Sequence, residues 1–290
     1  MLAITPLHPL FAARVTGLDL MQALDSARFA EVRAAFERYS VLVFPGQAID
    51  DAAQIALSER FGPLEATRAG INGTGSKLIV LTNVGPDGSI GAPTDKQVLN
   101  NRANQVWHTD SSFKPVPALA SLLSAREIPA EGGDTEYASM RAAYDALPDA
   151  DKAALRGWVA VHDFAWSRSR VDPTLMSDAE RAAHPPVRQA MVVEGEHGPA
   201  LYLGAHAARV EGMPEAEGRA LIDRLMAFAT QPQFVYRHVW ASHDLVLWDN
   251  RAVLHRATPF RSSNERRHMV RTTVAGQAPT LAARPAQAAE

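Results

Sequence analysis

A short motif in the middle of the chain carries residue types that bind metal ions. Residues 107–110 read WHTD, which places His108 and Asp110 two positions apart. If this segment is a β-strand, both side chains point to the same face, because side chains alternate between the two faces along a strand. An imidazole and a carboxylate can then bind one ion. A histidine two residues before an aspartate is common by chance, so the motif alone also fits a surface turn.

A third candidate ligand lies much later in the chain. His255 follows the apolar run DLVLWD and the turn residues DNR, and a hairpin at that turn would direct it toward the interior of a β structure. Two histidines and one carboxylate occupy one face of an octahedron and leave three positions open, which suits non-haem iron(II). The same ligands also fit zinc, but catalytic zinc needs only one open position and supplies no redox chemistry. We therefore expect His108, Asp110 and His255 to form a metal site, with iron(II) favoured.

Two further segments offer side chains that bind carboxylates. The text EGGDTEYASM places Thr135 in a predicted strand behind a paired-glycine turn. The text NERRHMVRTTV places Arg267 and Arg271 four residues apart, on one face of a strand, with Arg266 turned away. Arginines that point into a β interior are costly unless they meet anions, and their planar guanidinium groups suit carboxylates. The alternative is a pair of salt bridges at the rim of a sheet.

The elements that must position these residues are mainly strands. Strand-like runs recur at short intervals beyond residue 118, among them residues 157–166, and helical patterns interrupt them near 139–156 and 214–230. Earlier in the chain, capped amphipathic patterns predict helices that begin near residues 25 and 50. Because the chain shows no regular βαβ alternation, we expect a mainly β fold with added helices and a double-sheet core.

We expect the chain to form one domain. No internal repeat or linker divides residues 1–276, and residues 277–290 lack periodicity, which predicts a disordered tail. Residues 85–104 are rich in glycine, proline, asparagine and aspartate. A connection of this length is usually functional or mobile.

Composition limits the classes of function. Hydrophobic residues make up 47% of the 290 residues and charged residues 21%, as in ordinary globular proteins. A net charge of −3 without a basic block predicts no binding of nucleic acid or anionic membranes. The absence of cysteine excludes disulfides, thiolate metal sites and a cysteine nucleophile. No window approaches the length of a membrane span, and the N-terminus lacks a signal-peptide pattern, so we expect a cytoplasmic protein.

A series of segments, spread from Pro6 to about Gly276, carries a resemblance to a known family. In chain order they read PLHPLFAARVTGLDL, SVLVFPGQ, FGPLE, NQVWHTDSSF, GGDTEYASMRAAYDALP, FVYRHVW, LVLWDNRAVLHR and RRHMVRTTV. In this order they resemble the taurine dioxygenase and 2,4-dichlorophenoxyacetate dioxygenase family of iron(II)- and 2-oxoglutarate-dependent oxygenases. The resemblance implies a double-stranded β-helix, or jelly-roll, core.

The resemblance also implies roles for the metal and 2-oxoglutarate residues. Iron(II) is bound in the family by residues that match His108, Asp110 and His255. The distal carboxylate of 2-oxoglutarate, the cosubstrate, is held by a threonine and an arginine that match Thr135 and Arg267. No acid–base residue is implied, so positioning and exclusion of water are the main tasks of the protein.

On the substrate side, Arg271 and Asn104 match family residues. Arg271 matches an arginine that meets the anionic group of the substrate, and Asn104 matches an asparagine found in part of the family. The segment between His255 and the arginines is one residue longer than the family pattern, so Arg266 competes with Arg267 by simple counting. The text RRHMVRTT and strand alternation favour Arg267.

The activity implied by the resemblance is oxidation of a small anionic substrate by O2. 2-Oxoglutarate is decarboxylated to succinate and CO2 while the substrate is hydroxylated. The segments SVLVFPGQ, LGAHAARVEGMPEAEGR and ATQPQFVYRH look most similar to the phenoxyacetate branch, in which hydroxylation beside an ether oxygen yields a phenol and an oxo acid. Taurine, another sulfonate or an alkyl sulfate would suit Arg271 equally well.

Specificity is expected from two segments. They are residues 85–104 and residues 162–173, where Phe164 and Trp166 could face an aromatic ring. Ordinary packing explains these two aromatic residues equally well.

Two other classes of function stay open at this point. One is a non-oxygenase metal-binding β-barrel, in which the same ligands hold zinc or nothing. The other is a structural oligomerisation module, in which the apolar helix at 221–228 packs against a partner subunit. Neither class explains why the predicted metal and carboxylate ligands occur together. For the enzyme as well, we expect a homo-oligomer.

Overall fold

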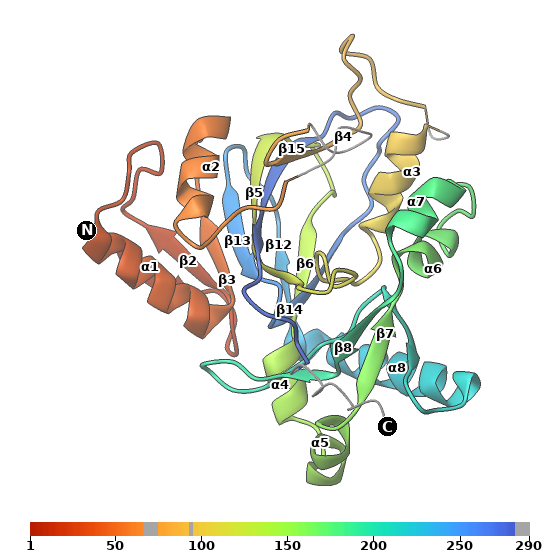
Figure 1. The fold of residues 1–290 in the computed structure, drawn as a ribbon. Helices are drawn as coiled ribbons and strands as arrows, with labels where there is room; N and C mark the ends of the chain where they lie inside the picture. Colours follow the sequence, from red (N-terminus) through yellow and green to blue (C-terminus); the bar gives the residue numbers. More distant parts are fainter. Residues whose placement is uncertain (67–74, 93–94, 282–290) are drawn as a thin grey trace.

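Two of the four sheets in the described residues pack against each other around a shared interior (Figure 1). The computed structural model describes residues 1–66, 75–92 and 95–281. The larger sheet is seven-stranded and has the order β1 (Ala3–Pro6), β2 (Ala13–Thr16), β3 (Val41–Phe44), β13 (Leu245–Asp249), β5 (Ala118–Glu127), β15 (His268–Ala275) and β4 (Leu78–Thr82). The smaller sheet has the order β12 (Val235–His238), β6 (Thr135–Ser139) and β14 (Val253–Ala257). The prediction of a mainly β fold with a jelly-roll core is confirmed.

Side chains from both sheets fill the interior between them. Leu123, Trp248 and Met269 extend from the larger sheet into this space. They pack there with Tyr137 of β6. Leu122, the neighbour of Leu123, points to the opposite face of β5 and packs against the helical layer. Because both faces of β5 are buried, its sequence is apolar without alternation.

Helices α1 (Ser26–Tyr39) and α2 (Asp51–Glu59) cover the outer face of the larger sheet (Figure 1). The side chain of Asp25 caps α1 by accepting a backbone N–H at 2.8 Å. Asp50 caps α2 in the same way at 2.7 Å. These caps satisfy N–H groups that have no partner inside the helix. The two helices predicted early in the chain are confirmed.

A second helical layer packs beside the smaller sheet. It consists of α4 (Met140–Asp145), α5 (Asp149–Leu155) and α8 (Glu215–Ala229). Ile222 and Leu225 of α8 are fully buried in the same apolar cluster as α4. The apolar face of α8 is therefore used within its own chain, which removes the argument that this helix is free to bind a partner subunit.

Shorter elements complete the described fold. They are β7 (Val159–His162), β8 (Val187–Ala190), β9 (Val192–Val193), β10 (Ala200–Leu201), β11 (Ala207–Val210), α3 (Lys96–Ala103), α6 (Phe164–Ser169), α7 (Asp178–Ala183) and a 3-10 turn at Pro232–Phe234. The segment 85–104, expected to be a loop, contains α3. The strand-like run 157–166 ends at His162, and α6 begins two residues later because Asp163 caps it at 2.9 Å.

Two local structures considered from the sequence, a hairpin before His255 and a strand at WHTD, are not formed. The residues in question still reach the interior. β13 and β14 do not form a hairpin, because β13 pairs with β3 and β5 whereas β14 pairs with β6. The turn between them crosses from one sheet to the other. WHTD is not a strand either: His108 forms an isolated bridge with His255, and Asp110 lies in a turn.

The last described residues contact the body of the protein. Thr280 accepts a hydrogen bond from Ala190 N at 2.9 Å and donates one to Gln189 Oε1 at 2.6 Å. Residues 277–281 of the predicted tail are therefore held against β8, and residues 282–290 lie outside the described residues. In the described part of the chain, no helix has the length and apolar character that crossing a membrane requires.

The protein is expected to lose stability in acid because of the buried side chain of His162. It is fully buried, its Nδ1 lies 2.9 Å from Ser112 Oγ, and burial lowers its pKa from 6.5 to about 3. The neutral form is therefore stabilised by folding, and this contribution is present above pH 6.5 and is lost as the pH falls toward 3. At about pH 5 the free energy of unfolding of the metal-free protein should be lower by about 2 kcal/mol through this group.

The measurement is urea unfolding of the metal-free wild type and of His162→Asn at neutral pH and in acid. Asparagine keeps a hydrogen-bonding group near Ser112 but does not titrate. The wild type should lose more stability than the variant over this interval. Equal losses would show that His162 does not titrate as its burial implies.

Candidate metal centre and adjoining cavity

The three predicted metal ligands converge at the open end of the interior. His108 and His255 exchange backbone hydrogen bonds of 3.0 and 2.8 Å, which places their rings 4.1 Å apart. Asp110 approaches from the following turn, with Oδ2 3.8 Å from His255 Nε2. One ligand atom from each residue lies within 4.8 Å of the others, and all three residues are buried. The geometry therefore brings together the set expected from the sequence.

The hydrogen bonds around the two histidines fit a metal site. His108 Nδ1 lies 2.7 Å from the carbonyl oxygen of Val106, so in the neutral ring this nitrogen carries the proton and Nε2 is free to bind a metal. His255 has a buried ring nitrogen, Nδ1, without a hydrogen-bond partner. Buried polar atoms without partners are uncommon and point to a missing ligand or to strain. Two nitrogen donors and one carboxylate fit iron(II).

The protonation states also suit metal binding. Burial lowers the pKa of both His108 and His255, so both are neutral near pH 7, the form that binds metals. Burial alone would raise the pKa of Asp110, but Arg271 and the two histidines bring it well below its ordinary value. The carboxylate is therefore ionised and supplies the negative charge that a divalent cation needs.

Two polar residues that the sequence analysis did not select fix the position of Asp110. Ser121 Oγ donates to Asp110 Oδ2 at 2.7 Å. Asn250 Oδ1 accepts from Asp110 N at 3.2 Å and from Trp248 Nε1 at 2.9 Å. Asn250 belongs to the DNR turn, which connects the two sheets. The same turn therefore also fixes the position of the turn that carries Asp110. The ring of Trp248 also packs against the ligand set, with its centroid 4.6 Å from that of His255.

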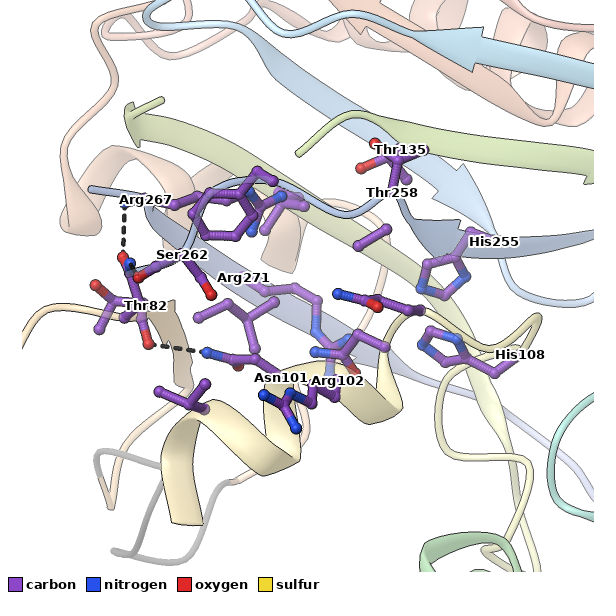
Figure 2. A pocket seen from close by; sticks show the side chains of 18 of the residues that line it. Thr82, Asn101, Arg102, His108, Thr135, His255, Thr258, Ser262, Arg267 and Arg271 are labelled. Carbon is purple, nitrogen blue, oxygen red and sulfur yellow. Dashed lines mark hydrogen bonds between the residues drawn. The ribbon is translucent and has the colours of Figure 1, made fainter. Parts of the chain in front are cut away.

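A cavity of about 230 Å³ opens beside the ligands (Figure 2). Its lining includes Thr135, Arg267, Arg271 and Asn104, so every carboxylate-binding candidate from the sequence faces the same space as His108. Thr135 Oγ1 accepts a hydrogen bond from Trp240 Nε1 at 3.0 Å, which leaves its own proton available to a ligand. The backbone oxygen of Asn104 accepts from Ala257 N at 2.8 Å.

The structure separates the two adjacent arginines. Arg266 is exposed and binds Glu127 at 2.8 Å on the surface. Arg267 reaches into the cavity, its Nε is buried without a partner, and no carboxylate within the described residues pairs with it. Met269, two positions on, packs in the interior, so Arg267, Met269 and Arg271 share one face of the chain. Burial lowers the pKa of Arg267 to about 10, so it stays cationic at neutral pH.

Arg271 lies closer to the metal ligands than Arg267 does. Its Nη1 is 2.5 Å from Asp110 Oδ1, and its Nε is buried without a partner. The backbone of Arg267 is held by Asn83, whose Oδ1 accepts from Arg267 N at 2.8 Å. The two guanidinium groups thus occupy different parts of one cavity, one beside the ligands and one farther along the wall (Figure 2).

Gly133 is expected to be essential for the position of Arg267. It has φ +68°, and a Cβ there would lie 3.0 Å from Pro129 Cγ and 3.3 Å from Arg267 Nε. Gly133→Ala should therefore displace the guanidinium and weaken binding of a carboxylate in the cavity by roughly tenfold, besides destabilising the backbone by about 1 kcal/mol. Calorimetry with 2-oxoglutarate and thermal unfolding measure the two effects.

Gly212→Ala is the matched control. Gly212 has φ +78° and nothing within 4 Å of the added Cβ, so this variant carries the backbone strain without the contact. It should lose stability but keep carboxylate binding. If both variants bind 2-oxoglutarate equally well, Gly133 does not set the position of Arg267.

The two aromatic residues considered for specificity differ in position. Phe164 packs against Phe113, with ring centroids 4.3 Å apart, and against His206. Trp166 lines a second cavity that also contacts His108. Packing therefore accounts for Phe164, whereas Trp166 is available to a ligand.

Comparison with known proteins identifies the family. The family model described as "Taurine catabolism dioxygenase TauD, TfdA family" matches residues 3–273. The chain belongs to this family. The resemblance noted in the sequence is thereby confirmed, and the two-sheet core with few helices agrees with TauD, TfdA structures.

Individual relatives cover almost the entire chain. The alpha-ketoglutarate-dependent 2,4-dichlorophenoxyacetate dioxygenase of Cupriavidus pinatubonensis is 45% identical over 92% of this chain and 96% of its own length. The (S)-phenoxypropionate/alpha-ketoglutarate-dioxygenase of Sphingobium herbicidovorans is 38% identical over 94% of each chain. The crystal structure of AAD-2 in complex with Mn(II) and N-oxalylglycine superposes with a TM-score of 0.90 at 41% identity and covers 98% of this chain and 100% of that one.

Proposed function

We propose that the protein is an iron(II)- and 2-oxoglutarate-dependent dioxygenase that cleaves an aryloxyalkanoate such as 2,4-dichlorophenoxyacetate. One observation carries the proposal. The two histidines of a two-histidine, one-carboxylate set line the same cavity as the unpaired guanidinium of Arg267, in a chain 45% identical to a 2,4-dichlorophenoxyacetate dioxygenase. Hydrolytic zinc chemistry would have no use for the second feature.

The site residues predicted from the sequence have the following roles in this proposal. His108, Asp110 and His255 hold iron(II), which supplies activation of O2 coupled to decarboxylation of 2-oxoglutarate. Arg267 donates two parallel hydrogen bonds to the distal carboxylate of 2-oxoglutarate, and the Thr135 hydroxyl donates a third. These contacts fix the cosubstrate in one orientation and need no proton transfer by the protein.

The substrate binds on the remaining side of the metal ligands. Arg271 meets its anionic group, and Asn104 lies along the same wall. Hydroxylation of the carbon next to the ether oxygen gives a hemiacetal, which collapses to a phenol and an oxo acid. Substrate, 2-oxoglutarate and O2 are thereby converted into phenol, oxo acid, succinate and CO2. The names of two groups of relatives, active on dichlorophenoxyacetate and on phenoxypropionate, support this substrate class over sulfonates and alkyl sulfates.

Three broader properties complete the proposal. Residues 1–276 form the single oxygenase domain. A reducing, cytoplasmic location suits a chain without cysteine that depends on iron(II). The enzyme is a homo-oligomer, and analytical ultracentrifugation at several concentrations tests this point independently of the activity.

Succinate formation tests the activity directly. The protein is loaded with iron(II) without oxygen and then mixed with 2-oxoglutarate, O2 and one member of a panel of phenoxyacetates, phenoxypropionates, taurine and alkyl sulfates. We expect phenoxyalkanoates to stimulate succinate formation and to release a phenol. Stimulation by taurine or alkyl sulfates alone would overturn the substrate class but keep the oxygenase. The absence of iron-dependent 2-oxoglutarate binding would overturn the oxygenase itself. Arg266→Gln, which changes a surface arginine outside the cavity, is the control variant.

A further inference from the structure

A second cavity, of about 300 Å³, shares one metal-ligand candidate with the first. His108 lines both cavities. α3 contributes Ala103 to the lining of the second cavity, and α6 contributes Trp166 and Arg168. Its wall combines large apolar side chains, Trp107, Trp166, Val171 and Met226, with polar and charged ones that include several arginines. An aromatic ring entering this cavity would be surrounded by groups that favour it and would approach the metal site.

Arg168 of α6 contributes to this wall a positive charge that no carboxylate of the described residues neutralises. Its Nε is buried and has no hydrogen-bond partner, and no carboxylate in the described residues forms an ion pair with it. Its guanidinium carbon instead lies 4.6 Å from the ring centroid of Phe164. By contrast, Arg219 in the same cavity pairs with Asp223 at 2.8 Å. A partly buried cation whose buried Nε has no partner is costly, so Arg168 needs an anionic ligand more than a structural partner.

The surroundings of Arg168 place that ligand beside the metal site. Burial lowers the pKa of Arg168 to about 10, and Arg271 acts in the same direction while Asp110 opposes it. The guanidinium groups of Arg168 and Arg271 therefore repel each other, and they line the two cavities that share His108. An anion between them removes this repulsion and satisfies both.

The chemistry of an aryloxyalkanoate fits this position. The carbon that is hydroxylated carries both the ether oxygen and the carboxylate, so the carboxylate must lie next to the metal when this carbon does. A cation held at a distance from the ligands could not bind it. Arg168 lines the cavity together with His108, and the aryl group on the ether oxygen then extends along the wall that contains Trp166.

We infer that Arg168 binds the carboxylate of the aryloxyalkanoate substrate opposite Arg271, and that the second cavity receives the aryl ring. The inference rests on the proposed function and adds a specificity residue to it. Arg267 and Thr135 keep 2-oxoglutarate in the first cavity. Selectivity for carboxylates over neutral aryl ethers then depends on α6, a helix that does not contribute to the metal site.

Binding of an acid and of its neutral amide tests this role. The protein is loaded with Mn(II) and N-oxalylglycine, an unreactive analogue of 2-oxoglutarate, and titrated calorimetrically with 2,4-dichlorophenoxyacetate or its primary amide. Arg168→Gln should weaken binding of the acid about 10- to 100-fold, because a charge-assisted contact is lost. Binding of the amide should change by less than about threefold, and N-oxalylglycine should bind as in the wild type.

Arg209→Gln is the control, because Arg209 is exposed on β11 and lines neither cavity. It should leave the affinities for acid and amide unchanged. Equal losses for acid and amide in Arg168→Gln, or no loss for either, would overturn the inference while leaving the proposed function intact. If the wild type binds N-oxalylglycine but no aryloxyalkanoate, the substrate class and the inference both fail. Should Arg168→Gln not fold, Arg168→Met keeps the alkyl stem and undergoes the same comparison.

Discussion

Asp110→Ala should abolish iron-dependent succinate formation, with a loss of kcat of roughly a thousandfold or more. The carboxylate lies with the imidazoles of His108 and His255 in one buried set and is the only anionic member of it. Its removal leaves two neutral donors, which hold a divalent cation weakly. Succinate formation at saturating 2-oxoglutarate gives the rate, and electron paramagnetic resonance of added Mn(II) gives metal binding separately.

The same substitution affects stability through Arg271. Asp110 Oδ1 lies 2.5 Å from Arg271 Nη1, so the alanine variant leaves a partly buried guanidinium without its partner. Loss of one member of a buried ion pair costs about 3–5 kcal/mol, which thermal unfolding of the metal-free protein would detect. Asp172→Ala is the control, since the Asp172 side chain is partly exposed and, among the described residues, accepts its hydrogen bonds from Thr174, two positions later. An Asp110→Ala protein that is folded, binds Mn(II) and retains turnover within about tenfold of wild type would contradict the assignment of Asp110 as a metal ligand.

The sequence predicted those parts of the fold that depend on local signals. Capping residues such as Asp25 and Asp50 mark helix starts, and the apolar run of β5 marks a strand that is buried on both faces. Short helices with weak apolar periodicity were missed. α3 has the sequence KQVLNNRA, and its polar composition resembles a loop.

Long-range pairing could not be predicted from local sequence. The turn after β13 looks like a hairpin turn, yet β13 is already paired on both sides by β3 and β5, so the chain must cross to the other sheet. His255 reaches the ligand set by this crossing. The three metal ligands could nevertheless be predicted from the sequence. Their residue types and the order of the segments shared with the family identify them more strongly than any prediction of strands does.

Charge compensation is also invisible in the sequence. Arg266 and Arg267 are adjacent, and only the structure separates the one that pairs with Glu127 from the one that enters the cavity. Arg168 lies in the segment 162–173, two residues beyond the run expected to be a strand, and nothing in this sequence shows that its charge has no partner. Such residues become candidates only when the positions of all nearby carboxylates are known.

Arg267→Ala should raise the KM for 2-oxoglutarate about 100-fold, whereas Arg271→Ala should chiefly raise the KM for the aryloxyalkanoate. Arg267 has no carboxylate partner among the described residues and lies along the wall with Thr135, away from the contact between Arg271 and Asp110. The first change therefore removes a contact to the distal carboxylate, and the second removes a contact beside the metal. Initial rates with each substrate varied in turn measure both constants.

Calorimetry with N-oxalylglycine and the Mn(II)-loaded protein separates binding from turnover. Arg267→Ala should bind the analogue weakly, and Arg271→Ala should bind it nearly as well as the wild type. Arg266→Ala, which breaks the surface pair with Glu127 and a hydrogen bond to the Gly88 carbonyl oxygen, should change neither KM, because exposed ion pairs contribute little and both contacts lie outside the cavity lining. Because Arg271 also contacts Asp110, Mn(II) affinity is measured for every variant, so that a weakened metal site is not mistaken for lost substrate binding. If Arg271→Ala instead abolishes binding of the analogue while Mn(II) still binds, the roles of the two arginines are reversed.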